Sequence, residues 1–264
     1  MPGLSHGWGD VQALQLRGDG REAVAEQLVE EVPVALVYNG LSHAVMMASP
    51  LDLPDFALGF SLSEGIADKP ADIRAVDIVP ETDGLSLQIA LAPACFWRLK
   101  ARRRQLIGRT GCGLCGAEAL NTAIRPIARV GEGLRMTAVQ LHAGLRQLAG
   151  LQPLNQRTGG VHAAALLDAH GGLLVREDVG RHNALDKLIG AMHRQAHPGG
   201  AVLLTSRASY ELVHKAASAG LELVVAISAP TAMAVQLAGE AGITLVGFAR
   251  EDRMTVYTHP ERLP

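Results

Sequence analysis

The chain has 264 residues, of which 48% are hydrophobic and 19% charged, a composition that excludes a predominantly disordered protein. Its formal net charge of -2 gives no indication of bulk binding to nucleic acid or to an acidic membrane. The sequence shows neither a signal peptide nor an apolar run of the roughly 20 residues that a membrane span needs. Its three cysteines do not fit the disulfide framework of a small secreted domain, so we expect reduced thiols and a cytoplasmic protein.

The first part of the chain predicts a small α+β unit that follows a flexible arm. Residues 1–25 are expected to form the arm, because glycine and polar residues prevail at the start of the chain without apolar periodicity. From residue 26 onward, β-forming residues alternate around Asn39-Gly40, a dipeptide that favours a tight hairpin turn. The unit is expected to continue with a helix after Asp52, a hairpin over residues 75–92, an exposed basic loop over residues 98–116, a helix over residues 116–124, and to end at residue 134.

The second part, residues 135–264, predicts an α/β domain. Leucines at helical spacing indicate a helix over residues 137–151, and a hairpin and a helix that begins near Asn183 follow. Continuous apolar strands then alternate with helices, which is typical of buried parallel strands. The predicted fold class is therefore α/β (α+β overall), with a mixed sheet in the larger domain; the expected β-α-β-α-β elements are residues 201–206, 209–220, 221–228, 231–242 and 243–249.

The motif with the clearest chemistry is Gly-Cys-Gly-Leu-Cys-Gly over residues 111–116. Its two thiols, Cys112 and Cys115, stand among glycines that leave the sulfur atoms uncovered. Arg109 and the arginines at 102–104 add positive charge, which favours the nucleophilic thiolate form of cysteine. We therefore predict thiol chemistry at this pair.

Two other interpretations of the cysteine pair are weaker. A structural zinc site needs about four ligands, and beyond this pair only Cys95 and histidines such as His162 or His182 remain to complete it. A thioredoxin-like site would place the pair after a strand and at the start of a helix, whereas a basic, glycine-rich segment precedes this pair. We expect no resident metal.

Polar residues also gather in residues 157–162 and 176–183, at boundaries between expected elements. Taken one by one, these residues are readily explained as helix caps or as hydrogen-bonded side chains. Taken together, they are more polar than structural duty requires, because burying polar groups is costly. This reasoning singles out Asp178, Arg181, His182, Asn183, Asp186 and Lys187 as functional candidates.

A ligand site is predicted at the carboxyl ends of the parallel strands, where helix N-termini present free N–H groups. Hydroxyls and a cation follow two of these strands, and a phosphate would suit them. Charged residues follow the third strand, where they either contact a base or ribose or form a solvated turn. The candidates are Ser206, Arg207, Thr231, Phe248, Ala249, Arg250, Glu251, Asp252 and Arg253.

Taken together, these motifs resemble those of the formate dehydrogenase accessory sulfurtransferase family, FdhD. The resemblance runs in order from residue 26 to residue 263 and is carried by residues 109–116, 158–162, 177–187, 206–211 and 255–263. It implies a sulfurtransferase that takes persulfide sulfur from a cysteine desulfurase. The sulfur then passes to the molybdenum cofactor, bis-molybdopterin guanine dinucleotide, before insertion into formate dehydrogenase.

The resemblance also implies roles for single residues. Cys112 matches the persulfide cysteine of the family, Cys115 matches its second thiol, and residues 248–253 match its cofactor-binding segment. The larger domain is expected to resemble the cytidine deaminase fold, and the protein is expected to be a homodimer.

The fold analogy raises the alternative of a zinc-binding, deaminase-like protein or a nucleotide-binding module without sulfur transfer. Zinc-dependent deaminases carry a catalytic glutamate shortly after a zinc-ligating histidine, and a cysteine pair further on. In this chain Ala163 and Ala164 follow His162, and the cysteine pair precedes it. Because one fold supports several chemistries, the motifs favour sulfur transfer.

Overall fold

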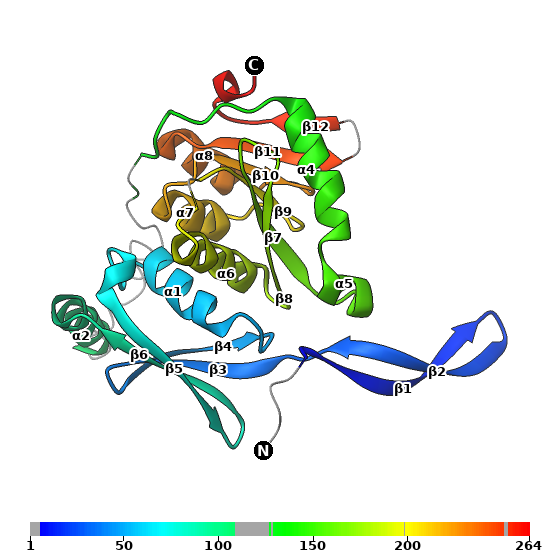
Figure 1. The fold of residues 1–264 in the computed structure, drawn as a ribbon, viewed down its shortest axis with the longest axis horizontal. Helices are drawn as coiled ribbons and strands as arrows, with labels where there is room; N and C mark the ends of the chain where they lie inside the picture. Colours follow the sequence, from blue (N-terminus) through cyan, green and yellow to red (C-terminus); the bar gives the residue numbers. More distant parts are fainter. Residues whose placement is uncertain (1–5, 109–126, 128, 198, 251–252) are drawn as a thin grey trace.

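The computed structural model describes residues 6–108, 127, 129–197, 199–250 and 253–264. Cys112, Cys115 and the helix predicted over residues 116–124 lie outside these ranges. Figure 1 shows two packed units and an arm that projects from them. Within the described ranges, no helix combines the length and the apolar character needed to cross a membrane.

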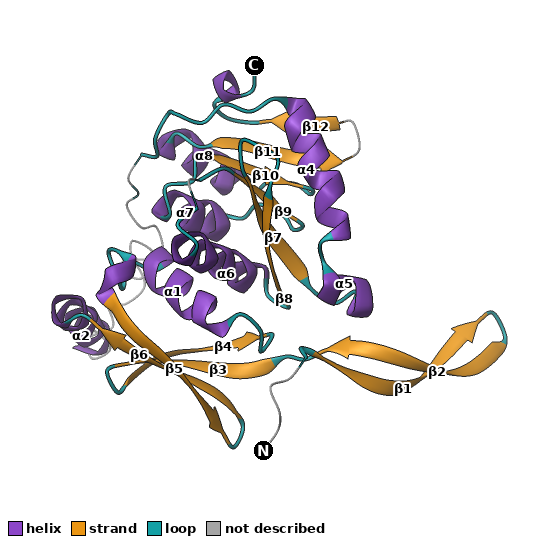
Figure 2. Cartoon of the chain, in the orientation of Figure 1, coloured by secondary structure: helices purple, strands orange, loops and turns teal. Residues whose placement is uncertain are grey.

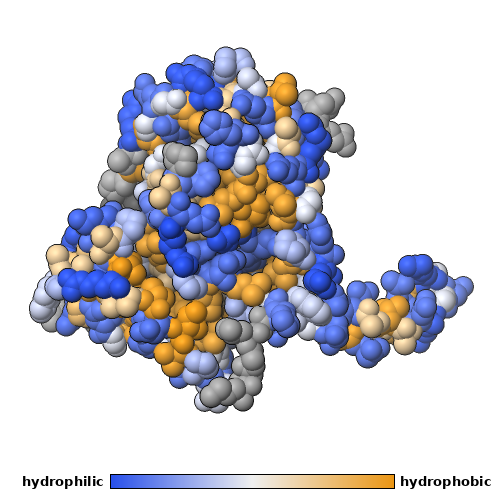
Figure 3. All heavy atoms as spheres, viewed as in Figure 1, coloured by the Kyte–Doolittle hydropathy of each residue, from blue (hydrophilic) through white to orange (hydrophobic). Residues whose placement is uncertain are grey.

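The arm is an antiparallel hairpin of β1 (Trp8–Arg17) and β2 (Gly20–Val29). The expectation of an arm without regular structure is therefore wrong for residues 8–25. The two-residue turn between the strands has a positive φ of 58° at Gly18, as a tight hairpin turn requires. Leu14 and Leu16 stay exposed on the arm, and apolar patches interrupt its polar surface in Figure 3.

The smaller unit is a four-stranded sheet with α1 (Leu53–Ser63) on one face. Asn39 and Gly40 both have positive φ values, 46° and 79°, which confirms the predicted tight turn. The apolar core between sheet and helix includes Leu36 and Phe56, which are fully buried. The strands, in spatial order, are β4 (Leu41–Ala48), β3 (Val32–Tyr38), β6 (Gly84–Leu91) and β5 (Ile73–Glu81).

The basic segment that was expected to be a loop starts as a helix. Helix α2 spans Pro93–Gly108, so the loop prediction is wrong for residues 98–108. Arginine, lysine, leucine and glutamine are good helix formers, and the segment has no glycine or proline between its first and last residues. Cys95 and Leu99 anchor the helix in the core of the smaller unit.

The larger unit is built on a mixed six-stranded sheet, shown in Figure 2 with helices packed around it. Its β9, β10 and β11 are parallel and follow the predicted β-α-β-α-β order, which confirms the interpretation of the continuous apolar runs. The other strands pair antiparallel. In spatial order the strands are β12 (Arg253–Val256), β11 (Thr244–Arg250), β10 (Leu223–Ala226), β9 (Ala201–Leu204), β7 (His162–Leu167) and β8 (Leu173–Asp178).

Helices cover both faces of the large sheet. Helices α6 (Arg181–Arg194), α7 (Tyr210–Ser218) and α8 (Ala232–Ala241) share one apolar core with the sheet. The other face packs against α4 (Ala138–Gly150). A short helix, α5 (Pro153–Thr158), connects α4 to β7, and 3-10 turns occur at Pro70–Asp72 and Pro260–Arg262. Residues 129–134 run along this unit, where the Val130 N–H donates to the carbonyl of Ala241.

The two units meet where α1 crosses α6 (Figure 1). Gly59 of α1 lies against the carbonyl of Asp186, and Gly190 of α6 lies against the carbonyl of Asp55. A Cβ atom at either position would overlap backbone atoms of the opposite helix. The crossing therefore requires glycine at both positions, because only glycine lets two backbones approach so closely.

Buried ion pairs join the units around this crossing. The Lys187 Nζ lies 2.6 Å from the Asp178 Oδ2, and both side chains are fully buried. Ser49 of the smaller unit satisfies both groups, since its N–H donates to Asp178 and its carbonyl accepts from Lys187, each at 3.0 Å. Asn183 adds a 2.8 Å bond to the carbonyl of Met47.

A second cluster lies further along the same seam. The Lys215 Nζ contacts Asp186 and Glu64, each at 2.9 Å, and the Ser63 hydroxyl donates to Asp186 at 2.6 Å. Burial raises the pKa of the Asp186 carboxyl, and the positive charge of Lys215 opposes this shift. The seam is thus polar but hydrogen-bonded, as buried charges must be.

The helix crossing yields a stability prediction. Gly190→Ala should destabilise the protein by about 1–3 kcal/mol, because the added methyl group must push α1 and α6 apart. Gly150→Ala is the matched control, since Gly150 ends α4 with open space at its Cβ position. Urea unfolding of both variants checks the prediction. An equal midpoint for the two would contradict the close crossing.

Candidate functional site

Three loops meet at the carboxyl edge of the large sheet. The loops after β9 and β10 touch, since the Thr231 N–H donates to the carbonyl of Ala208 at 3.0 Å. The end of β11 joins them, because the Phe248 N–H donates to the carbonyl of Ser228 at 3.1 Å. The three predicted groups of ligand-binding candidates therefore have neighbouring backbones, as parallel strand order requires.

The candidates after β9 and β10 differ in what they offer a ligand. Arg207 is exposed. The Ser206 hydroxyl is buried and donates to the carbonyl of Arg207 at 3.1 Å. Thr231 caps α8, where its Oγ1 accepts from the Ala234 N–H at 3.2 Å. Of these three residues, Arg207 thus offers an exposed positive charge, while the two hydroxyls already have structural roles.

The candidates at the end of β11 are divided between surface and core. Phe248 has a positive φ of 51° and is 37% exposed, whereas the side chain of Ala249 is buried in the core that α4 covers. Arg250 is exposed, and its Nε donates to the carbonyl of Ile227 at 2.9 Å. Arg253 is also exposed. Glu251 and Asp252 lie outside the described residues.

These described groups fit an anionic ligand with a nucleotide arm. Arg207, Arg250 and Arg253 are exposed cations, and α7 and α8 both begin at this edge, where helix N-termini offer N–H donors and positive potential. The exposed ring of Phe248 offers an apolar surface for a base.

Two histidines lie at the same edge, because β7 runs antiparallel to β9 and begins where β9 ends. The Thr205 hydroxyl accepts from the Ala163 N–H at 2.8 Å, which places His162 next to the loop after β9. His162 pairs in register with Asp178 at the end of β8, and α6 follows with Arg181 and His182.

The charges around these histidines act on each other. Burial lowers the pKa of His162, and the nearby Arg181 lowers it further. Burial likewise lowers the pKa of His182, and Arg181 adds to this effect, whereas Glu211 opposes it. The His182 Nε2 lies 3.7 Å from the Glu211 Oε2. Both imidazoles therefore favour the neutral form at neutral pH.

The sequence analysis considered His162 and His182 as zinc ligands and named His182 a functional candidate, but it did not place either histidine at the carboxyl edge of the sheet. The signal that could have placed both histidines at this edge is the β7–β8 hairpin. Because β7 pairs antiparallel with β9, the hairpin brings residues 157–162 and 176–183 to the carboxyl end of β9. The structure gives structural partners to four of the six functional candidates in residues 178–187. Asp178, Asn183, Asp186 and Lys187 are buried and bond to the smaller unit or to Lys215.

Cys95, the only described cysteine, is buried and lies close to Asp68 and Asp72. Arg98 fills this group, since its Nη2 lies 2.7 Å from the Asp68 Oδ2 and 3.3 Å from the Cys95 Sγ. Asp72 accepts two backbone N–H bonds. The group is therefore internally satisfied and serves the structure.

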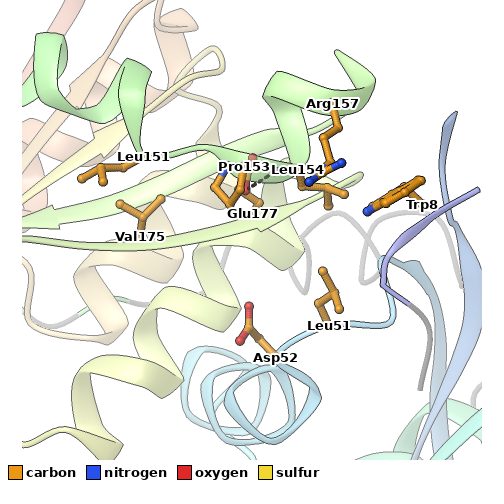
Figure 4. A pocket seen from close by; sticks show the side chains of 9 residues that line it. All are labelled: Trp8, Leu51, Asp52, Leu151, Pro153, Leu154, Arg157, Val175 and Glu177. Atoms are coloured by element: carbon orange, nitrogen blue, oxygen red, sulfur yellow. Dashed lines mark hydrogen bonds between the residues drawn. The ribbon is translucent and has the colours of Figure 1, made fainter. Parts of the chain in front are cut away.

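A cavity of about 290 Å³ lies at the base of the arm (Figure 4). Arg157 stacks on Trp8 beside it, 5.0 Å from the ring centroid. Glu177 accepts the N–H groups of Leu154 and Asn155 at the start of α5, and burial raises its pKa. Among the described residues that were predicted to bind the cofactor, none lines this cavity.

The fold and its polar sheet edge define the class: a two-unit α+β protein with a candidate ligand site on the larger unit and, in the sequence, a cysteine pair beyond the end of α2. The model of the FdhD/NarQ family matches residues 29–264. The chain belongs to this family. The motifs noted in the sequence at residues 109–116, 158–162 and 177–187 fall within the matched residues.

Individual relatives agree with the family match. The chain is 49% identical to a sulfur carrier protein FdhD from Bordetella petrii over 96% of this chain and 93% of the relative. It is 54% identical to a sulfur carrier protein FdhD from Cupriavidus necator over 90% of this chain and 84% of the relative. The fold is also similar to a crystal structure described as a formate dehydrogenase accessory protein from Desulfotalea psychrophila, with a TM-score of 0.75 and 25% sequence identity. The alignment covers 97% of this chain and 99% of that protein.

The histidine environment yields a titration prediction. Arg181→Gln should raise the pKa of both His162 and His182, because it removes a positive charge that disfavours each imidazolium. Glu211→Gln should lower the pKa of His182 and leave that of His162 nearly unchanged. Titration of the two imidazoles by NMR checks both. Unshifted pKa values in the Arg181 variant would show that this guanidinium does not act on the pair.

Proposed function

We propose that this protein is a sulfur carrier that accepts persulfide sulfur from a cysteine desulfurase on Cys112. It passes the sulfur to the bis-molybdopterin guanine dinucleotide form of the molybdenum cofactor before the cofactor enters formate dehydrogenase. The observation that supports this proposal is membership of the FdhD/NarQ family, whose relatives carry the name of sulfur carrier proteins. We place the reaction in the cytoplasm, with the protein as a homodimer.

The loading step is a thiol exchange without net oxidation. The Cys112 thiolate attacks the terminal sulfur of the donor's persulfide, a new S–S bond forms, and the donor's S–S bond breaks. The donor cysteine leaves as a thiolate, and Cys112 becomes the persulfide. The arginines that precede Cys112 in the sequence favour the attacking thiolate. Cys115 either exchanges sulfur with Cys112 or assists it.

The cofactor is the substrate of the second step, and we assign its nucleotide arm to the carboxyl edge. Arg207 offers a charge to the phosphates. Thr231 is the N-cap of α8 and Ser206 lies in the loop that leads to α7, and both helix starts add backbone donors. Residues 248–253 would contact the base, with Asp252 accepting from the edge of guanine. Phosphate contacts are the same for every nucleotide, so selectivity for guanine must come from residues 248–253.

The loading step is tested by mapping the sulfur. After incubation with a cysteine desulfurase and L-cysteine, the wild-type protein should gain sulfur on the Cys112 peptide, because this thiol matches the persulfide position. Cys112→Ser should abolish the gain, whereas Cys95→Ala, at the buried thiol, should retain it. Intact-mass and peptide analysis measure both. Sulfur carried only on Cys95 would overturn the assignment.

The cofactor site is tested with nucleotides as surrogates. GDP should bind more tightly than ADP, and Arg207→Ala should weaken both, because it removes a charge on the phosphates. Asp252→Ala should chiefly remove the preference, by about 1–3 kcal/mol. Arg146→Ala, at an exposed cation on α4, is the control and should change neither. Calorimetry measures all four proteins, and equal weak binding of GDP and ADP by wild type would refute the site.

A further inference from the structure

Helix α2 presents an exposed aromatic side chain beside a dense run of cations. The chain has two tryptophans, and one of them, Trp97, is 63% exposed. Residues 98–104 read Arg-Leu-Lys-Ala-Arg-Arg-Arg, and the sixteen-residue helix contains no acidic residue. Such a helix differs from the chain as a whole, whose formal net charge is -2.

Contacts within the smaller unit hold these side chains without neutralising all of them. Arg98 is paired with Asp68. Arg102 and Arg103 donate only to backbone carbonyls, those of Gly65 at 3.2 Å and Ser42 at 3.0 Å, among the contacts of the described residues. Carbonyl bonds fix the guanidinium groups in place but leave their net charge available to a partner.

The tryptophan is also held in place. The Lys100 Nζ lies 5.1 Å from the Trp97 ring centroid and 5.4 Å from that of Phe96, within the range of cation–π contacts. An indole that is exposed but already oriented loses little conformational entropy on binding. Tryptophan and arginine are also the residues most enriched at binding hot spots.

The position of α2 in the chain connects this surface to the sulfur chemistry. Cys112 follows the last residue of the helix, Gly108, by four residues. Covalent geometry thus keeps its Cα within about 14 Å of that of Gly108. Trp97 stands eleven residues before the helix end, or roughly 16 Å along the axis. A protein footprint of ordinary size, about 800 Å² per partner, spans both.

We propose that one side of α2, where Trp97, Lys100 and Arg103 follow one another at three-residue spacing, is the docking surface for an acidic patch on the protein that donates sulfur. This inference rests on the proposed function and names the partner surface of its loading step. Charge complementarity selects the partner and speeds its encounter, and Trp97 supplies the apolar anchor. The nucleotide arm of the cofactor is already assigned to the carboxyl edge of the larger unit, so the partner inferred for α2 is a protein.

The test compares a protein donor with a donor that has no protein surface. Cys112 is loaded either by a cysteine desulfurase with L-cysteine or by inorganic polysulfide, and the initial rate is measured by peptide mass analysis. The variants are Trp97→Ala and the double variant Lys100→Gln with Arg103→Gln, which keeps N–H donors and removes two charges. Arg146→Gln on α4, an exposed cation, is the control.

Each α2 variant should slow loading by the desulfurase about ten-fold or more, whereas loading by polysulfide and the control variant should match wild type. Added salt should slow the wild type more than the double variant. Equal loading of all variants by the desulfurase would overturn the docking surface. An equal loss of loading with polysulfide would also overturn it, because that result would show that α2 acts on the thiol itself. Absence of loading in wild type would instead overturn the proposed function.

Discussion

The buried pair of Asp178 and Lys187 controls how the rest of the molecule is arranged. Removing two charges from water is costly, and the cost is met only when every remaining hydrogen-bonding group has a partner. Gly180, Asn183 and Glu177 of the larger unit supply some of those partners, and Ser49 of the smaller unit supplies the others, so the pair is fully satisfied only when the two units are correctly docked. Loss of either partner alone would leave a buried charge, which typically costs about 3–5 kcal/mol. The pair also joins the end of β8 to α6, and this geometry sets Arg181 and His182 at the carboxyl edge.

The sequence predicts local patterns well and long-range polar contacts poorly. Continuous apolar runs indicated β9, β10 and β11, and the parallel rule then placed Arg207, Thr231 and Phe248 at one edge. The structural role of Asp178 and Lys187 was not predicted, because their partner Ser49 lies well over a hundred residues earlier in the chain. A buried structural charge and a catalytic charge look alike in a sequence, since both are polar residues in an apolar context.

Two further errors had local causes. In β1 the alternation of Val11 and Ala13 with glutamines was present, but flanking glycines obscured it, and the strand buries too little apolar surface to show a strong pattern. In α2 the run of arginines suggested a solvated loop, although arginine is a good helix former and Leu99 lies in the core. Charge density indicates exposure, and an exposed residue can stand on a helix as readily as in a loop.

The helical nature of α2 changes what the cations can do. On a loop these cations would be a diffuse positive field. On a helix anchored by Cys95 and Leu99, the described cations Arg98, Lys100, Arg102 and Arg103 have positions fixed by the helix. This helix belongs to the smaller unit, whereas the carboxyl edge belongs to the larger. Because Cys112 is four residues from Gly108 but fifteen from Ile127, the end of α2 limits its range more tightly than the larger unit does. The α1–α6 crossing, with glycine at positions 59 and 190, therefore sets the separation between the surface of α2 and the carboxyl edge of the larger unit.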